Sequence, residues 1–270
     1  MMSEDARGDG TVGKALDVLD QVAGHGRPVR FADLLRESPF PKATLYRLLQ
    51  TLTSQGMLQF DPDTGAYSLG VRLVRLAHAA WQTTSLAPIA RPSLDRLSAQ
   101  VGETVHLAQL DNGQVLYVDK RNATVPVEMY STAGKVGPAY CTGVGKAMLA
   151  FLPTERAEEA LKRQAFHRFT GKTLTTPEAL RVELAAIRAR GFAFDDEEHE
   201  PGIICIAMPI LSEGGHVLGA LSVTSTTARR SLADLATLAP VLRETTARIA
   251  ADVRSWRFPD TMSPPLSRTG

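Results

Sequence analysis

Apolar positions along the first 70 residues predict three short helices followed by a hairpin. From Thr11 the hydrophobic side chains recur with helical spacing until Gly24 and Gly26, and the stretches FADLLRES and PKATLYRLLQTLTSQG repeat that spacing. The tight turn SPFP separates these two stretches, and Pro41 is suited to the first position of the third helix. MLQFDPDTGAYSL then flanks a DPDTG turn with apolar residues. This series predicts a winged helix-turn-helix domain over residues 11–70.

A helical run over residues 71–86 is expected to connect this domain to the rest of the chain. Its apolar residues form one stripe, and Pro88 and Pro92 are expected to break the helical pattern. The stripe needs a partner, which is either the core of the same chain or the same helix of a second subunit. The sequence leaves these two alternatives open.

From Glu103 onward the periodicity changes and predicts a second domain, of the α+β class, over residues 87–255. TVHLAQL and QVLYVDKR flank a DNG turn and predict a hairpin, and VEMYS is a candidate for a further strand. The predicted helices are CTGVGKAMLAFL, TERAEEALKRQA, TPEALRVELAAIRARG and the closing SLADLATLAPVLRETTARIAADV, and IICIAMPILS and HVLGALSVTST are predicted strands. Residues 1–10 and 256–270 are expected to be disordered tails.

Composition and charge narrow the class of protein. Of the 270 residues, 44% are hydrophobic, and 30 basic residues are balanced by 29 acidic ones. This balance gives no global attraction to nucleic acid or membrane, so any nucleic-acid contact must come from local placement. Two cysteines are too few for a disulfide framework, the polar N-terminus is unlike a signal peptide, and no run of 18 apolar residues is present. We therefore expect a cytoplasmic protein without a membrane partner.

The third predicted helix has a face that suits the major groove of DNA. In a helix-turn-helix the N-terminal part of the second helix enters the groove, where small residues permit close approach, Arg can bind guanine and Gln can bind adenine. Arg30, before the second helix, is a further candidate for a phosphate contact. The alternative is an ordinary solvated face, because residues 1–80 are neutral overall and the wing tip carries Asp61 and Asp63. The candidate groove-facing residues are Lys42, Ala43, Thr44, Tyr46, Arg47 and Gln50.

The glycine-rich stretch CTGVGKA is a candidate anion site. It does not fit a nucleotide phosphate loop, since Tyr140 stands where that motif has Gly and Ala147 follows the lysine. Thr142 could instead cap a helix whose free N–H groups, at Gly143 and Val144, face a carboxylate. An ordinary glycine-rich helix start explains the spacing equally well.

The acidic run DDEEHE invites interpretation as a metal site or a general acid/base pair. Six adjacent polar residues cannot converge on one ion, so we prefer a loop that lends one or two side chains, above all Asp195, to a pocket. Cys205 follows in an apolar strand, where cysteine is usually inert core. A catalytic cysteine would need a positioned base, and nothing in the spacing pairs it with His106, His199 or His216.

From about Thr11 to Val253, the sequence resembles the IclR family of bacterial transcriptional regulators. The family signature falls on the stretch GFAFDDEEHEPGIIC and the two residues after it, and YCTGVGKAMLA and GALSVT are also similar to the family. At the end of the signature Ile210 fits, whereas Leu211 and Ser212 depart from it. The matching residues are Gly191, Asp195, Glu198, Cys205, Ile206 and Ala207.

The resemblance implies a GAF-like effector domain that binds a small, usually carboxylated metabolite. It also implies a homodimer or homotetramer on double-stranded operator DNA, repressor activity, no cofactor and no catalysis. Two alternatives remain, namely an activator of an aromatic-acid or sugar-acid operon, and an enzyme that uses Cys205 on a small acid. A sugar acid or a related 2-oxo acid is the favoured effector, because the inferred pocket is polar. The effector-binding residues that the resemblance implies are Met129, Gly143, Val144, Asp195, Cys205, Ser222 and Thr224.

Overall fold

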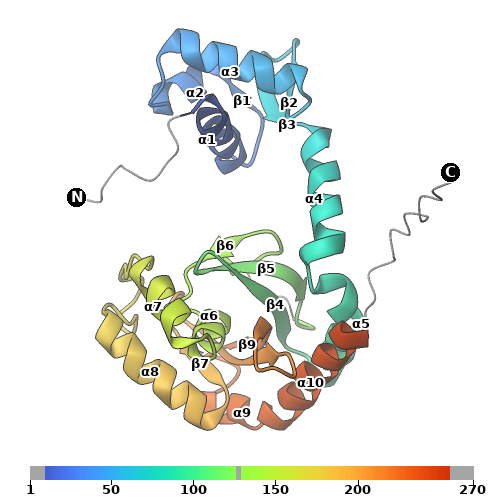
Figure 1. The fold of residues 1–270 in the computed structure, drawn as a ribbon, viewed down its shortest axis with the longest axis vertical. Coiled ribbons are helices and arrows are strands. Elements are labelled where there is room, and N and C mark those ends of the chain that lie inside the picture. Colours follow the sequence, from blue (N-terminus) through green and yellow to red (C-terminus); the bar gives the residue numbers. More distant parts are fainter. Residues whose placement is uncertain (1–9, 126–128, 256–270) are drawn as a thin grey trace, which may run out of the picture. The chain divides into compact units, whose positions relative to one another are not determined.

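The computed structural model describes residues 10–125 and 129–255, and the chain divides into two compact units between Thr83 and Thr84 (Figure 1). The predicted tails lie, apart from Gly10, outside the described residues. Residues 127 and 128 of the candidate strand VEMYS lie outside them too, and the rest of that stretch forms no strand. The elements in order are α1 (Thr11–Gly24), β1 (Val29–Arg30), α2 (Phe31–Glu37), α3 (Lys42–Ser54), β2 (Leu58–Asp61), β3 (Ala66–Leu69), α4 (Val71–Thr84), α5 (Ala87–Val101), β4 (Thr104–Asp111), β5 (Gln114–Arg121), β6 (Val136–Gly137), α6 (Gly143–Ala150), α7 (Thr154–Lys162), α8 (Pro177–Arg190), β7 (Ala193–Asp196), β8 (Ile203–Leu211), β9 (Val217–Thr226), α9 (Leu232–Ala236) and α10 (Ala239–Ser255).

The N-terminal unit is a winged helix-turn-helix, as predicted. Leu34 of α2 and Leu45 and Leu49 of α3 are fully buried, and they pack with apolar residues of α1 into one core. The hairpin β2–β3 gains a third strand, β1, which the sequence analysis did not identify because it has only two residues. Pro41 occupies the N-cap position of α3, so its predicted place as first helical residue is wrong by one position.

The prediction that Pro88 and Pro92 break the chain's helical pattern is wrong. α5 begins at Ala87 and runs through both prolines. Pro88 stands in the first turn, where its missing N–H would have no helical partner. Pro92 removes one internal hydrogen bond, yet Ala90 and Leu94 on either side are fully buried, and this packing holds the helix together.

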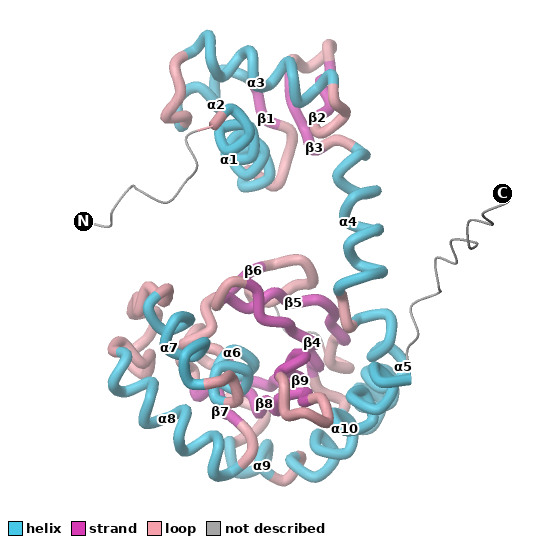
Figure 2. The backbone as a smooth tube through the Cα atoms, viewed as in Figure 1, coloured by secondary structure: helices cyan, strands magenta, loops and turns pink. Residues whose placement is uncertain are grey.

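The second unit is built on one six-stranded antiparallel sheet of order β6-β5-β4-β9-β8-β7. The predicted hairpin β4–β5 turns at Asn112 and Gly113, which both have positive φ, as a two-residue hairpin turn requires. Helix α6 covers one face of the sheet, whereas α5 and α10 pack together and cover the other face (Figure 2). The fold class is therefore the one that the sequence predicted, α+β with an N-terminal winged domain.

Two further boundaries differ from the sequence-based expectation. The closing helix over residues 231–253 is two helices, α9 and α10, because Pro240 cannot donate a hydrogen bond to the carbonyl of Ala236. The start of the acidic run lies in a short strand, β7, rather than in a loop. β7 is an edge strand that pairs with β8 alone, and this places Asp195 in the sheet.

Candidate functional site

Strand register gathers five chemically useful side chains on one face of the sheet. Asp195 of β7 lies opposite Cys205 of β8, which in turn lies opposite Thr224 of β9. In the neighbouring row, Ser222 of β9 lies opposite His106 of β4. Directly opposed residues point to the same face, and residues two apart on a strand do so as well. One carboxyl, one thiol, two hydroxyls and one imidazole therefore lie side by side under α6.

Helix α6 brings its N-terminus against this face because its first residue lacks a side chain. An ideal Cβ on Gly143 would lie 2.4 Å from the sulfur of Cys205, which is closer than two such atoms can approach. Thr142 is the N-cap residue, but its hydroxyl donates to the carbonyl of Pro138 at 2.7 Å and makes no cap hydrogen bond. Thr142 is therefore the N-cap residue by position, as the sequence indicated, but its side chain does not cap the helix. Among the described side chains, none caps the N–H groups of Gly143 and Val144, and the positive end of the helix dipole faces the site.

Between α6 and the sheet lies a small cavity of about 30 Å³. That volume holds one or two water molecules, so a metabolite would require the walls to move apart. Tyr130, Ser131, His199 and Glu200 add further polar groups to the walls. The full lining comprises His106, Tyr117, Tyr130, Ser131, Thr142, Gly143, Val144, Asp195, His199, Glu200, Ile203, Cys205, Ser222 and Thr224.

The cavity brings together six of the seven residues for which the family resemblance implied effector contact. Met129, the expected apolar wall, is buried but does not line the cavity. The apolar part of the lining comes instead from Tyr117, Val144 and Ile203. That these residues bind an effector stays a prediction.

His106 is the lining residue whose role the sequence did not reveal. Its Nε2 lies 2.9 Å from Oγ of Ser131, and its Nδ1 lies 3.4 Å from Oγ of Ser222 and 3.3 Å from Oγ1 of Thr224. Burial lowers the pKa of His106 to about 3, so the ring is neutral and has one donor and one acceptor nitrogen. The tautomer decides whether the two hydroxyls of β9 offer protons or lone pairs to the cavity. Ser222 is 116 residues from His106 in the sequence, so only the strand register brings these two side chains together.

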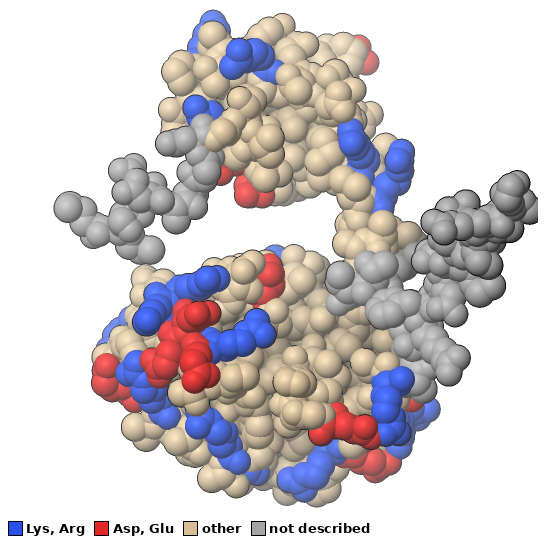
Figure 3. All heavy atoms as spheres, in the orientation of Figure 1, with Lys and Arg blue, Asp and Glu red and all other residues tan. Residues whose placement is uncertain are grey.

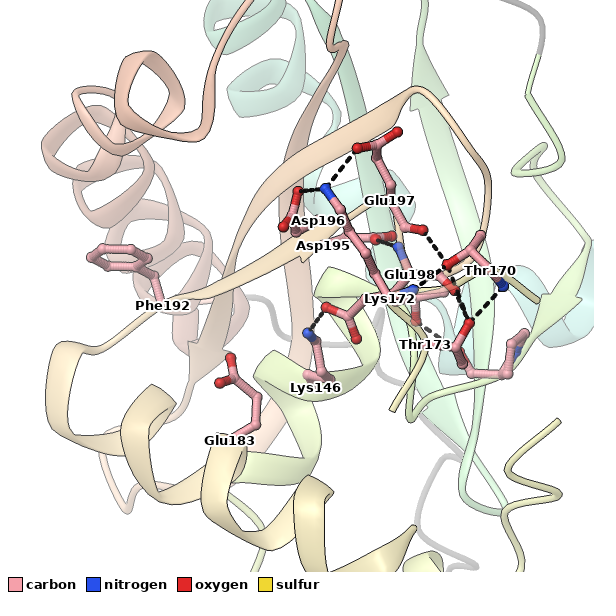
Figure 4. Close-up of polar contacts among 12 residues, drawn as sticks. Lys146, Thr170, Lys172, Thr173, Glu183, Phe192, Asp195, Asp196, Glu197 and Glu198 are labelled. Carbon is pink, nitrogen blue, oxygen red and sulfur yellow. Dashed lines mark hydrogen bonds and ion pairs between the residues drawn. The ribbon is translucent and has the colours of Figure 1, made fainter. Parts of the chain in front are cut away.

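A buried ion pair stands behind the cavity. Lys146 of α6 and Glu198 are 2% and 6% exposed, and the ammonium contacts the carboxylate directly (Figure 4). Oδ1 of Asp195 accepts a hydrogen bond from the backbone N–H of Glu198 at 2.9 Å. Burial, together with the nearby Glu198 carboxylate, raises the pKa of Asp195 to about 7. Lys146 therefore serves the acidic run and not a phosphate.

The side chains of Asp196 and Glu197 bind partners outside the cavity, whereas those of His199 and Glu200 line its wall. Lys172 bridges the carboxylates of Asp196 and Glu197 at 2.9 and 2.7 Å, and the hydroxyls of Thr170 and Thr173 hold the backbone of the run (Figure 4). Within the described ranges, no three or more His, Cys, Asp or Glu side chains cluster as metal ligands would. The side chains of the run thus have several different partners, and those of Asp195, His199 and Glu200 line the cavity.

In the N-terminal unit, α3 presents the predicted groove-facing residues to solvent. Lys42, Ala43, Tyr46, Arg47 and Gln50 are exposed, Thr44 is half-buried, and Arg30 is exposed at the end of β1. The amide of Gln50 donates to the phenol of Tyr46 at 3.1 Å, and Tyr46 also packs edge-on against Phe31. These contacts orient two of the candidate side chains before any DNA is bound.

The negative charge of Asp61 on the wing is stabilised by hydrogen bonds from neighbouring residues of the turn. The carboxylate of Asp61 accepts hydrogen bonds from the Thr64 hydroxyl at 2.7 Å and from the Asp63 N–H at 3.0 Å. Over the C-terminal unit, basic and acidic side chains are interspersed on the visible face and form no single field (Figure 3). In the N-terminal unit, Arg27 and Arg30 line an open groove beside β2 and β3, together with Asp33 and Asp61.

A winged helix-turn-helix joined to an α+β domain with a polar cavity defines a transcriptional regulator with a sensor domain. The family description "IclR helix-turn-helix domain" matches residues 11–62, and "Bacterial transcriptional regulator IclR C-terminal" matches residues 78–251. The chain belongs to the IclR family. Among the helices of the described ranges, none has the length and apolar character needed to cross a membrane.

Relatives of known sequence and structure agree with this assignment. The HTH-type transcriptional regulator XynR of Escherichia coli is 32% identical over 87% of this chain and 93% of its own length, and the transcriptional repressor IclR of the same organism is 31% identical over 80% of each. An IclR homolog from Microbacterium hydrocarbonoxydans, solved in complex with 4-hydroxybenzoate, has a TM-score of 0.79 at 27% identity, covering 92% of this chain and 100% of its own. The Thermotoga maritima IclR has a TM-score of 0.72 at 28% identity, covering 90% and 98%.

Proposed function

We propose that this chain is a repressor that binds operator DNA through α3 and the wing and releases it when a small carboxylate enters the cavity. The observation that carries this proposal is the cavity itself, in which two uncapped helix N–H groups and two strand hydroxyls meet on one chain with a groove-reading helix. Amide and hydroxyl donors at a helix N-terminus suit a carboxylate better than any cationic or purely apolar ligand.

A dimer is the assembly that fits this role. Val71 and Val74 of α4 are 74% and 67% exposed, and Val12 and Leu16 of α1 are 74% and 53% exposed. Such exposed apolar side chains favour an interface with a second copy over an intrachain core. Two winged domains would then read half-sites about 34–36 Å apart, or a multiple of that spacing. Pairing of such dimers into a tetramer is a further expectation of the family resemblance.

The acid is proposed to be a short 2-oxo acid or sugar acid. A cavity of about 30 Å³ has to expand for any of these, and a short acid demands the least expansion. The aromatic acid bound by the Microbacterium homolog marks aromatic acids as the alternative. The repressor sense rests on relatives such as the transcriptional repressor IclR and the acetate operon repressor of Salmonella typhimurium.

Cys205 supports a sensor rather than an enzyme. A nucleophilic cysteine acts as the thiolate, and thiolates form where the site is electropositive and partly exposed. Burial raises the pKa of the Cys205 thiol, and the neighbouring Asp195 carboxyl raises it further. The side chain is therefore a neutral thiol that packs between Gly143 and the strands.

The proposal is tested by fluorescence anisotropy with the full chain and DNA from the region upstream of its own gene. Addition of pyruvate, glyoxylate or 4-hydroxybenzoate should weaken operator binding by about 5–150-fold, which corresponds to a coupling of about 1–3 kcal/mol. Thr224→Val should retain DNA binding and lose the response, whereas Thr227→Val, at an exposed position, should retain both. Indifference of the protein to this DNA at low ionic strength would refute the proposal, and so would turnover of the acid.

A further inference from the structure

The charges around the cavity conflict with a carboxylate ligand. Among the described side chains, two carboxyl groups, those of Asp195 and Glu200, line the cavity, whereas no Lys or Arg does. The imidazole of His106 is neutral. A carboxylate that reached the helix N-terminus would therefore enter a cavity lined by like charges, and repulsion at contact distance in a desolvated site is severe.

Glu200 does not resolve this conflict. Both of its carboxylate oxygens accept hydrogen bonds from the backbone N–H of Tyr130, at 3.0 and 3.2 Å, and His199 lies 3.6 Å from one of them. These contacts lower the pKa of Glu200 against the effect of its partial burial, so this carboxylate keeps its charge.

Asp195 is in the opposite position. It shares a buried region with Glu198 and Lys146, and all three are at least nine-tenths buried. The ammonium of Lys146 contacts Glu198, and among the described side chains no Lys or Arg forms an ion pair with Asp195 (Figure 4). Two acids and one base in a water-poor region are neutral only when one acid holds a proton. Glu198 has the lysine, so the proton falls to Asp195.

We propose that Asp195 holds its carboxyl proton when the effector is bound and donates it in a hydrogen bond to the effector carboxylate, so that above neutral pH each acid binds together with one proton from solvent. This inference rests on the proposed function, since it assumes a carboxylate in this cavity. The arriving negative charge raises the pKa of Asp195 further, because it adds to the charge of Glu198. The pair then resembles two carboxyl groups that share one proton.

Other titratable groups also face Asp195, and each could add a pH dependence of its own. Of these, Glu198 favours the protonated form of Asp195, whereas Lys146 and His199 favour the ionised form. The groups that face it are Glu198 and His199 of the acidic run, Lys146 of α6, Cys141 before α6, Cys205 of β8 and Tyr117 of β5, with His106 and Glu200 in the remaining cavity wall.

The sign of the effect follows from the free protein. Burial raises the pKa of Asp195 to about 7, so below neutral pH the proton is already present and affinity is constant. Above neutral pH the free protein has lost it, and the dissociation constant should rise about tenfold per pH unit, or roughly 30-fold by pH 8.5. Binding should then take up nearly one proton.

The first experiment is calorimetry of the full chain with pyruvate, glyoxylate and 4-hydroxybenzoate between pH 6 and 8.5, in two buffers of different ionisation enthalpy. Asp195→Asn keeps a neutral donor, so it should bind the acid at every pH as well as the wild type does at pH 6, without proton uptake. Glu200→Gln should bind more tightly but keep the pH slope, and Asp111→Asn, at the exposed β4–β5 turn, should behave as wild type. A slope that persists in Asp195→Asn, or an acid affinity that this variant loses at all pH values, would overturn the proposal.

The second experiment needs no effector and separates this proposal from the proposed function. Infrared spectra of the free protein should contain a protonated-carboxyl band that titrates near pH 7 and is missing in Asp195→Asn. If that band is absent from the wild type at pH 6, Asp195 is ionised and the proton proposal is wrong, even where operator release by acids succeeds. If the band is present but no acid changes operator affinity, the proposed function fails while the protonated Asp195 stands.

Discussion

Replacement of Gly143 by alanine tests whether close packing of α6 on the sheet builds the cavity. The new Cβ would lie 2.4 Å from the sulfur of Cys205, 3.2 Å from Cβ of Ala207 and 3.5 Å from the backbone nitrogen of Asp195. The sulfur is fixed in a buried strand, so either α6 or β8 must shift. Overpacking of this kind destabilises a core by about 1–3 kcal/mol. For a unit of this size, 1 kcal/mol changes Tm by about 2–4 °C, so we expect a loss of roughly 2–12 °C.

Differential scanning calorimetry of the full chain measures this loss. Gly171→Ala is the matched control, because a Cβ there meets nothing within 4 Å. The double variant Gly143→Ala, Cys205→Ala removes the sulfur and should recover stability relative to the sum of the single changes, with a coupling of about 0.5–3 kcal/mol. Wild-type stability of Gly143→Ala, or strict additivity in the double variant, would show that the helix does not rest on the strand as described.

Three further predictions follow from the buried pair, the recognition helix and the buried imidazole. Lys146→Met should lower the free energy of unfolding, measured in urea, by about 3–5 kcal/mol, because it leaves the buried Glu198 carboxylate without its partner. Adding Glu198→Leu should recover most of that loss, and an undiminished loss in the double variant would contradict the prediction. Arg47→Ala should weaken operator binding by about 1–3 kcal/mol in anisotropy titrations and relax the base preference at one operator position. Arg36→Ala should do neither, and equal effects of the two variants would show that Arg47 does not contact the DNA bases. Because the pKa of His106 is lowered to about 3 in the folded protein from an ordinary 6.5, folded-state stability should be full above pH 6.5 and fall by up to about 1.4 kcal/mol per pH unit as the pH drops toward 3. His106→Asn should flatten this fall, and an unchanged profile in that variant would refute the assignment.

Features written into short stretches of sequence could be predicted. The leucine stripe of α3 and the Asn112–Gly113 turn each follow from local periodicity or backbone preference, and both are present. The helix break predicted at Pro92 was wrong because tertiary packing outweighed the local preference of proline. Strand β7 was not predicted because a four-residue segment with two carboxylates lacks the apolar pattern of a strand. His106 could be noticed but not placed, since its neighbours depend on the order β4-β9-β8-β7.

The family resemblance supplied what periodicity could not. It placed Asp195, Cys205, Ser222 and Thr224 together, and strand register gives the physical reason. Met129 does not line the cavity in this structure, and its expected part in effector binding stays a prediction. The Lys146–Glu198 contact joins two motifs that the sequence analysis considered separately.

The position of β7 at the margin of the sheet has a consequence for which acids can fit. β4 and β9 are each held by neighbours on both sides, so their hydroxyls and imidazole form a floor that cannot yield without breaking two ladders. β7 is held only by its ladder with β8, which has four residue pairs, so β7 can move more easily, and Asp195 would move with it. A larger ligand would therefore gain the additional space it needs at the β7 edge of the sheet. Variants of this chain that bind larger acids should therefore carry their substitutions in β7 and the acidic turn, whereas the cavity residues of β4 and β9 should be unchanged.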